Sequence, residues 1–215
     1  MQGGEKEMSM QTQWGYSILD ADSLTDMLTP SEFEAFTSGK YTESARVEAE
    51  ISSACSAVRN YVGWHLAPSH ACRMDATFFS ENVKSVKGDI LIQLPARFVS
   101  SVESITIAGT EYADYILETN GILRVFGANL WGISKRSAIV VEYTAGLTSD
   151  MMAAVKELLA HRVTHSVAVP AGITSQATGG VSVTYNANWV NSARATALPD
   201  DNKEVLAPYK LQGVF

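Results

Sequence analysis

The chain has 215 residues, of which 46% are hydrophobic and 18% charged, the proportions of a globular protein with one substantial core. No apolar run reaches the roughly 18 residues that a membrane-spanning helix needs, and the N-terminus lacks the basic and apolar stretches of a secretion signal. These features predict a protein that stays in the cytoplasm where it is made and has no membrane partner.

The formal net charge of −7 comes entirely from the first quarter of the chain. Residues 1–50 hold ten acidic and three basic side chains, whereas residues 51–215 hold thirteen of each. A surface that binds nucleic-acid phosphates needs a basic patch, so this distribution argues against a nucleic-acid-binding protein. It suits a surface that DNA passes without sticking to it.

The first quarter of the chain predicts an arm followed by short helices. Residues 1–22 are polar, with Trp14 and Tyr16 as bulky anchors, and are expected to form an arm that is disordered alone or ordered on a partner. A short helical turn is expected over Asp22–Leu28. Thr29-Pro30-Ser31-Glu32 then starts a second helix, because proline and acidic residues suit a first turn.

The clearest helix is predicted over residues 42–62, between the end signal Ser38-Gly39-Lys40 and Gly63. Its apolar residues fall within one stripe of a 3.6-residue period, which predicts a face packed into the core. The stripe consists of Val47, Ile51, Ala54, Cys55, Val58, Tyr61 and Val62.

Residues 66–144 change to the pattern of strands. Asn120-Gly121 lies between two β-rich segments and is the strongest hairpin signal, because both residues tolerate positive φ. We expect five or six antiparallel strands between two helices, the last of which, Ile139–Thr144, closes the sheet. The expected strands are Ala71–Phe79, Asp89–Gln93, Val102–Ile107, Tyr115–Glu118, Ile122–Phe126 and Ile139–Thr144.

Ala145-Gly146 turns the chain into a second long helix, predicted over residues 149–166 with Thr148 or Ser149 as its cap. Met152, Val155, Leu159 and Val163 form its apolar face, and Lys156, His161 and Arg162 lie at or beyond the edge of that face, where another subunit could bind. After this helix, Val167–Thr178 predicts a flexible or extended loop, Gly179–Tyr185 a strand and Leu198–Leu206 a short helix.

These elements predict an α+β fold: a small helical bundle, made of the N-terminal helices and the helix 149–166, with an inserted antiparallel β-sheet region and an extended C-terminal arm. The expected organisation is an N-terminal arm over residues 1–22, a core over 23–166 with the sheet insertion at 66–144, and a C-terminal arm over 167–215 with a short strand and helix.

Glu157, His161 and His165 have the best spacing for a metal site, because residues four apart share one face of a helix. That face borders the apolar stripe, however, and no further Asp, Cys or His ligand is evident nearby. Histidines near a helix C-terminus also complement its dipole, and we favour this structural role. No metal and no cofactor is expected.

Catalytic motifs are missing from the sequence. There is no Gly-x-Ser-x-Gly elbow, Walker pattern or Gly-x-Gly-x-x-Gly loop. Cys55 and Cys72 are expected to be two reduced structural thiols, since neither has a persuasive general base or the spacing of a zinc ligand, even though His70 lies two residues from Cys72. His65 and His70 are interpreted as structural, and the carboxylate pairs as helix-start or turn residues: Asp200-Asp201 and Asp114/Glu118. The protein is therefore predicted to be an interaction protein and not an enzyme.

The order of these elements, together with several short motifs, resembles that of a known protein family. Tyr61-Val62-Gly63-Trp64 ends the first long helix, Asn120-Gly121-Ile122-Leu123-Arg124 forms the hairpin, and Val141-Glu-Tyr-Thr-Ala-Gly146 precedes the second helix. Together with Gly179–Tyr185 and Val205-Leu-Ala-Pro-Tyr-Lys-Leu211, this resembles the head–tail connector (adaptor, head-completion) proteins of long-tailed bacteriophages and prophages, over about residues 24–211. Residues 1–22 are not matched.

The resemblance implies a structural virion protein at the head–tail junction, made in the host cytoplasm, that connects the DNA-filled head to the tail. Its implied form is a ring, usually of twelve subunits, that docks beneath the portal protein, extends the DNA channel and offers a platform to the next neck or tail-completion protein. Genomic DNA would pass through the channel without sequence-specific binding.

The C-terminal segment is the predicted contact with the portal or a neighbouring subunit, because its apolar pattern lies beyond a loose loop. The predicted contact residues are Val181, Val183, Tyr185, Leu206, Tyr209 and Leu211. Two alternatives remain open: another neck component, such as a stopper or tail-completion protein, and a small metal-dependent hydrolase that uses Glu157, His161 and His165.

Overall fold

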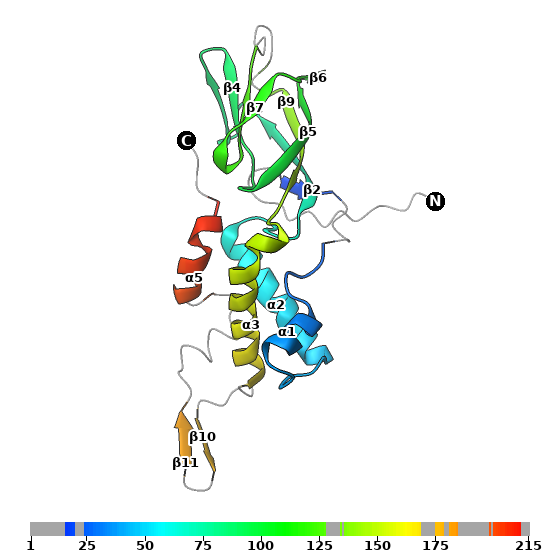
Figure 1. Cartoon of the computed structure of the whole chain (residues 1–215). Helices are drawn as coiled ribbons and strands as arrows, with labels where there is room; N and C mark the ends of the chain where they lie inside the picture. Colours follow the sequence, from blue (N-terminus) through cyan, green and yellow to red (C-terminus); the bar gives the residue numbers. More distant parts are fainter. Residues whose placement is uncertain are drawn as a thin grey trace, which may run out of the picture. The chain divides into compact units, whose positions relative to one another are not determined.

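The computed structural model describes residues 16–19, 24–127, 134, 136–168, 175–178, 181–184, 198 and 200–211. It shows the mixed α+β fold with antiparallel sheets that the sequence predicts (Figure 1). Contacts within the chain define two compact units. The helical unit comprises the described parts of residues 26–62 and 149–210, and the sheet unit those of residues 1–25, 63–148 and 211–215.

The helical unit begins with the predicted proline-initiated helix. The Thr29 hydroxyl accepts a hydrogen bond from the backbone N–H of Glu32 at 3.2 Å, and the Glu32 carboxylate accepts one from the N–H of Thr29 at 3.0 Å. This capping box satisfies two N–H groups that the helix leaves unpaired, which confirms the predicted start. The helices of the unit are α1 (Pro30–Phe36), α2 (Ala45–Val62), α3 (Ala153–Ala168) and α5 (Asp200–Leu206).

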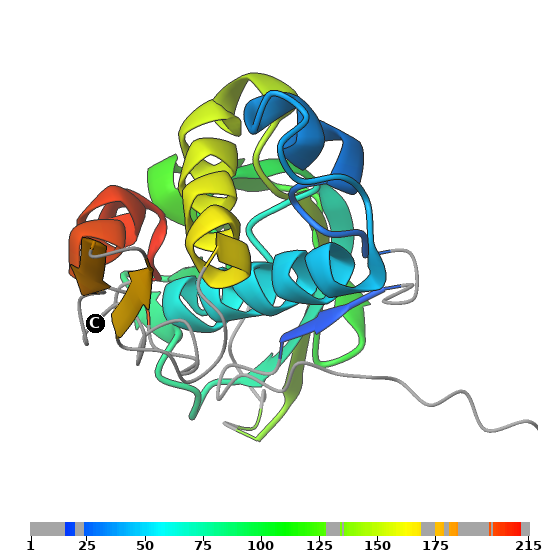
Figure 2. The ribbon, with the colours of Figure 1, turned by 90° about the horizontal axis from the view of Figure 1, so that it is seen from below.

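The long helices start later than predicted. α2 begins at Ala45. The hydroxyl of Ser44, the residue before it, accepts a hydrogen bond from the N–H of Val47 at 3.3 Å and so caps the N-terminus of the helix. A single 3₁₀ turn, η3 (Ser149–Met151), precedes α3. Figure 2 shows α1, α2 and α3 side by side. Their predicted apolar stripes are buried, except that Tyr61 is half-exposed.

The helical turn predicted at Asp22–Leu28 is wrong for its described part, residues 24–28, which are irregular. Met27 and Leu28 are buried as loop residues, and the proline at position 30 disfavours a helical conformation at Thr29. The two apolar side chains are therefore buried from an irregular segment and not from the predicted helix.

The sheet unit contains two antiparallel sheets, whereas the sequence predicts a sheet that its last strand closes. The five-stranded sheet has the order β1-β2-β9-β5-β6 and the four-stranded sheet the order β3-β4-β8-β7 (Figure 1). The strands are β1 (Tyr16–Ile18), β2 (His70–Thr77), β3 (Val83–Val86), β4 (Asp89–Gln93), β5 (Val99–Ile107), β6 (Thr110–Glu111), β7 (Tyr115–Leu117), β8 (Ile122–Val125) and β9 (Ala138–Ala145).

β9 lies at the centre of its sheet, which corrects the prediction that Ile139–Thr144 closes it. Its whole length pairs with β2, from Ala138↔Thr77 to Ala145↔His70, and its other edge pairs with β5. Alternation in a sequence reports which face of a strand is buried and carries no information on its two hydrogen-bonding edges.

The core of the sheet unit lies between the buried faces of its two sheets. Alternate residues of β2, β9 and β5 are buried on one sheet, as are those of β4 and β8 on the other. Two hydrogen bonds link the sheets: Asn82 donates to the Met74 sulfur at 3.2 Å, and the Tyr115 hydroxyl donates to the Val102 carbonyl at 3.1 Å. The buried side chains are Cys72, Met74, Ile90, Ile92, Ile105, Ile107, Leu123, Val125, Ile139, Val141 and Tyr143.

The predicted Asn-Gly hairpin is confirmed. Asn120 and Gly121 both have positive φ, at 65° and 75°, and β7 pairs with β8 on either side of them. A side chain at position 121 would also collide with the backbone, because its Cβ would lie 2.0 Å from the carbonyl oxygen of Ala96. Glycine is thus required here by space as well as by conformation.

Part of the predicted N-terminal arm belongs to the sheet unit. Tyr16–Ile18 forms β1, an edge strand that pairs with β2 in the register Tyr16↔Met74, and Tyr16 is buried as the predicted anchor. Residues 1–15, including Trp14, lie outside the described residues. The sequence signal of a three-residue edge strand is too short to stand out.

Several short strands were not predicted: β3, β6 and β10 (Ser175–Thr178), the last within the segment expected to be a loop. Each gains its stability from a neighbouring strand, so its own sequence is weakly patterned. Within the described residues, no helix is long and apolar enough to cross a membrane.

Candidate assembly interface

The C-terminal helix α5 is packed onto its own helical unit. Leu206 is fully buried, and α5 contacts α2 and α3. The Tyr61 hydroxyl of α2 donates a hydrogen bond to the carbonyl of Lys203 at 3.3 Å, and the Lys210 ammonium lies 5.0 Å from the centre of the Tyr61 ring. The side chain of Leu206 therefore belongs to the core of this chain.

The last described residues lie at the surface. Tyr209 is half-exposed within η4 (Ala207–Tyr209), and Leu211 is half-exposed against the chain that follows α2. A Cβ at Gly63 would meet the Leu211 side chain at 3.6 Å, an ordinary contact distance. Tyr185 lies outside the described residues. That these side chains contact another chain stays a prediction.

Val181 and Val183 lie in a two-stranded sheet. β10 pairs antiparallel with β11 (Val181–Thr184), in a register that sets Gln176 opposite Val183. No third strand joins this pair among the described residues. An isolated two-stranded hairpin is marginally stable in water, and its two outer edges carry backbone groups that can pair with another strand.

The acidic residues of the first quarter are accessible wherever the structure describes them. None of the six is buried, and among ion pairs between described residues only Glu32 takes part in one, with Lys156 of α3 at 2.5 Å. Burial alone would raise the pKa of Glu32, but hydrogen bonds from Lys156 and Thr29 outweigh it and lower the pKa. The six are Asp26, Glu32, Glu34, Glu43, Glu48 and Glu50.

The surface predicted on the second long helix is only partly exposed. His161 is 61% exposed and meets the ring of Phe36 edge-on, with ring centres 5.1 Å apart. Arg162 is buried instead of lying at a surface edge, which corrects the prediction. The apolar stem of the Arg162 side chain can pack in the core at little cost. Burial lowers the pKa of the guanidinium group, and the negative charge of Glu50 partly opposes this shift.

The three candidate metal ligands do not form a cluster. The His161 ring nitrogen Nε2 lies 3.9 Å from a Glu157 carboxylate oxygen, and both side chains are largely exposed. Among the described residues, no group of three or more His, Cys, Asp or Glu side chains is arranged to hold a metal ion.

A buried polar cluster that sequence reasoning did not assemble lies in the sheet unit. The Tyr16 hydroxyl hydrogen-bonds to Nδ1 of His65, and Nε2 of His65 donates to the carbonyl of Ala145 at 2.8 Å. The Cys72 sulfur lies 3.7 Å from the same Tyr16 hydroxyl. His65 thus connects β1, the chain after α2 and the end of β9, which confirms its predicted structural role.

Both cysteines are buried free thiols, as predicted. Burial raises the pKa of Cys55 and of Cys72 to about 11. Because only the thiolate reacts, and about one thiol in a thousand is ionised at pH 8 with such a pKa, we expect a thiol reagent such as DTNB to leave the native protein unlabelled.

Labelling of both thiols should become complete when the protein is unfolded in guanidinium chloride. The pKa values of both thiols are higher in the folded protein than in the unfolded chain. The protonated thiols therefore favour the folded state at neutral pH, and this contribution to the free energy of unfolding is lost as the pH rises toward 11. Rapid labelling of native protein at pH 8 would contradict the burial of these residues.

The sequence of the chain matches a known protein family. The model of a family described as head completion protein matches residues 26–211. A solved structure described as the neck of an empty GTA particle computed with C6 symmetry contains a chain with 19% sequence identity and a TM-score of 0.47; the match covers 93% of this chain and 97% of that chain. No curated protein matches.

Proposed function

Because the chain belongs to the head completion protein family, we propose that it forms a ring beneath the portal that links the DNA-filled head to the tail and extends the DNA channel. Family membership makes it a structural component of the neck of a phage-like particle, and not an enzyme. The proposed ring has twelve subunits and binds the portal on one side and the next neck or tail-completion protein on the other.

The observation that carries the portal contact is the hairpin β10–β11, which no other described strand joins. Its outer edges offer backbone N–H and C=O groups to a strand of another chain, and such strand addition would give the hairpin a third strand, which none of the described strands supplies. The C-terminal arm, residues 167–215, then works as the contact arm, with Val181 and Val183 in its strand.

The exposed acids support a passive channel. The DNA backbone carries one negative charge per roughly 1.7 Å of helix axis, so carboxylates at a channel wall or rim repel it and prevent tight binding. The described acids of residues 26–50 are accessible for this role.

A proline at position 183 tests the hairpin contact. We expect Val183→Pro to lower capture of the protein by isolated portal at least about tenfold, because proline removes a strand N–H opposite Gln176. Val183→Thr keeps a β-branched side chain and should bind within about twofold of the wild type. The measurement is a pull-down on immobilised portal.

Equal capture of the two variants would contradict the hairpin contact. Ending the chain at Ala177 tests the same arm, but it also removes α5, which packs on the helical unit. A wild-type protein that ignores the portal and binds an isolated tail component would instead favour a stopper or tail-completion protein.

A further inference from the structure

The last turn of α3 is held by polar bonds and not by buried apolar side chains. Val163 is the last buried residue of the helix, and residues 164–168 are half-buried or exposed. A turn without a buried apolar side chain gains little from the hydrophobic effect, and the ends of helices fray. The attachment of this turn therefore depends on the polar groups that bond to it.

Two residues near the start of α2 supply these bonds. The Arg46 guanidinium donates to the backbone carbonyls of Ser166 and Val167, at 3.3 and 3.4 Å. The Ser166 hydroxyl donates to the Glu50 carboxylate at 2.5 Å. The carbonyls of a last helical turn have no partner within their own helix, so Arg46 satisfies two of them. We call Arg46 and Glu50, with the groups that they bond, the α3 clamp.

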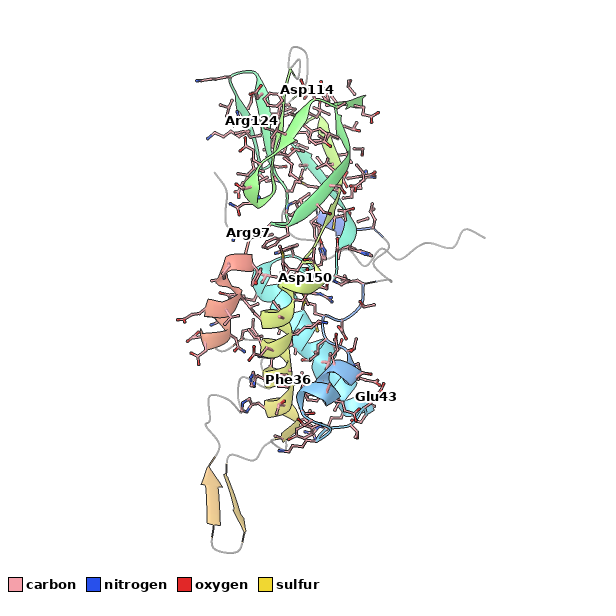
Figure 3. The ribbon with its side chains drawn as sticks, in the orientation of Figure 1. Phe36, Glu43, Arg97, Asp114, Arg124 and Asp150 are labelled. Atoms are coloured by element: carbon pink, nitrogen blue, oxygen red, sulfur yellow. The ribbon has the colours of Figure 1, made fainter. Side chains whose placement is uncertain are left out.

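Arg46 occupies a position that its own helix does not favour. It is the second residue of α2, where the positive end of the helix dipole repels a cation. Its two bonds place it at the last carbonyls of α3, where the negative end of that helix attracts a cation. Figure 3 labels Glu43, two residues before α2, at the end of the helical unit where α3 also ends. The placement of Arg46 is thus explained by α3 and not by α2.

The α3 clamp lies where the contact arm begins. Val167 is the first residue of the arm, and β10 follows at Ser175. The arm returns to the same two helices through α5, where Leu206 is fully buried and the Tyr61 hydroxyl donates to the carbonyl of Lys203. A buried apolar side chain holds the return, whereas polar bonds alone hold the start. The start is therefore the weaker of these two attachments.

We propose that Arg46 is a positioning residue for the portal contact: by holding the last turn of α3, it fixes the point from which β10 and β11 reach their partner strand. A turn that has frayed must be ordered again when the hairpin binds, and this ordering costs conformational entropy for every residue involved. The assignment rests on the proposed function, because it gives the hairpin of that function its point of attachment.

Replacing Arg46 tests the clamp. Arg46→Ala should lower the affinity of the full chain for isolated portal about fivefold or more, since ordering even one residue again lowers an affinity roughly fivefold. Arg46→Lys keeps a cation with N–H donors near the carbonyls and should bind within about threefold of the wild type. Arg136→Ala removes the same charge from an exposed residue before β9 and should leave the affinity unchanged. Affinities are measured by surface plasmon resonance on immobilised portal.

Hydrogen exchange separates a local effect from a loss of fold. In the Arg46→Ala variant, the amides of residues 166–168 should exchange at least about tenfold faster, whereas those of residues 51–58 in α2 should keep their wild-type rates. The melting temperature should fall by no more than about 3 °C, because Arg46 is exposed. If the alanine variant fails to fold, Arg46→Met, which keeps the apolar stem and removes every donor, carries the same test.

Three results would overturn the role of Arg46. They are unchanged exchange at residues 166–168, faster exchange with unchanged portal affinity, and an equal loss of affinity in the Arg136→Ala variant. A wild type that ignores portal contradicts the proposed function alone. The ratio of the affinities of the Arg46→Ala variant and the wild type is then measured on the isolated next neck component, where an unchanged ratio overturns the clamp as well.

Discussion

Replacing Gly146 with alanine is expected to destabilise the protein by about 4 kcal/mol or more. Gly146 has φ of 145°, a conformation that L-residues rarely adopt. An added Cβ would lie 2.5 Å from the Cα of Ser69 and 2.7 Å from the carbonyl oxygen of Pro68. Both are backbone atoms, so no side chain can rotate away to make room.

Gly88→Ala is the matched control for this substitution. Gly88 also has positive φ, at 93°, but nothing lies within 4 Å of the position of its Cβ, so only the conformational cost of about 1–2 kcal/mol remains. Urea unfolding monitored by circular dichroism gives both values. If the Gly146 variant matched the Gly88 variant in stability, the close approach of the two chain segments would be wrong.

Replacing His65 with alanine is expected to cost about 3 kcal/mol or more. The substitution leaves a cavity beside Trp64, whose ring meets His65 edge-on at 5.3 Å, and removes the hydrogen-bond partners of Tyr16 and Ala145. All of these groups are buried, so water cannot replace the lost bonds without opening the core.

His161→Ala makes the same chemical change at an exposed site, where the expected effect is within about 0.5 kcal/mol. Tyr16→Phe removes only one partner of His65 and should cost about 1–3 kcal/mol. Thermal unfolding of the three variants ranks them, and hydrogen exchange at Ser17 reports whether β1 is released. A His65 variant as stable as the His161 variant would show that the cluster contributes nothing.

Local structure was predictable where the cause is local. The capping box at Thr29 and the Asn120-Gly121 hairpin each depend on residues within four positions of one another. The stripes of the two long helices were predicted for the same reason, because helical periodicity shows in any window of a few turns. The two long helices start a few residues later than predicted, because several neighbouring Ser and Thr residues could each cap the helix and the sequence does not say which one does.

The candidate interface was less accessible to sequence reasoning. Leu206 was predicted as a contact residue because it is apolar and far from other apolar runs, yet it packs on α2 and α3 of its own chain. The half-exposed apolar side chains on one face of the four-stranded sheet were missed for the converse reason. Leu91 and Ile116 come from different strands, and only their pairing with Arg124 brings them onto one surface.

By itself, the sequence determined the α+β class, the two long helices and six of the strands between them, the confinement of excess negative charge to residues 1–50 and a likeness to head-completion proteins that the family match confirms. The tertiary structure alone decided that Ser137–Val163 contains the central strand of a sheet, that the backbone at Ser69 leaves no room for a side chain at Gly146, and that His65 joins three segments. The reason is that strand edges, close backbone approaches and buried hydrogen bonds depend on residues tens of positions apart, whose meeting no local pattern records.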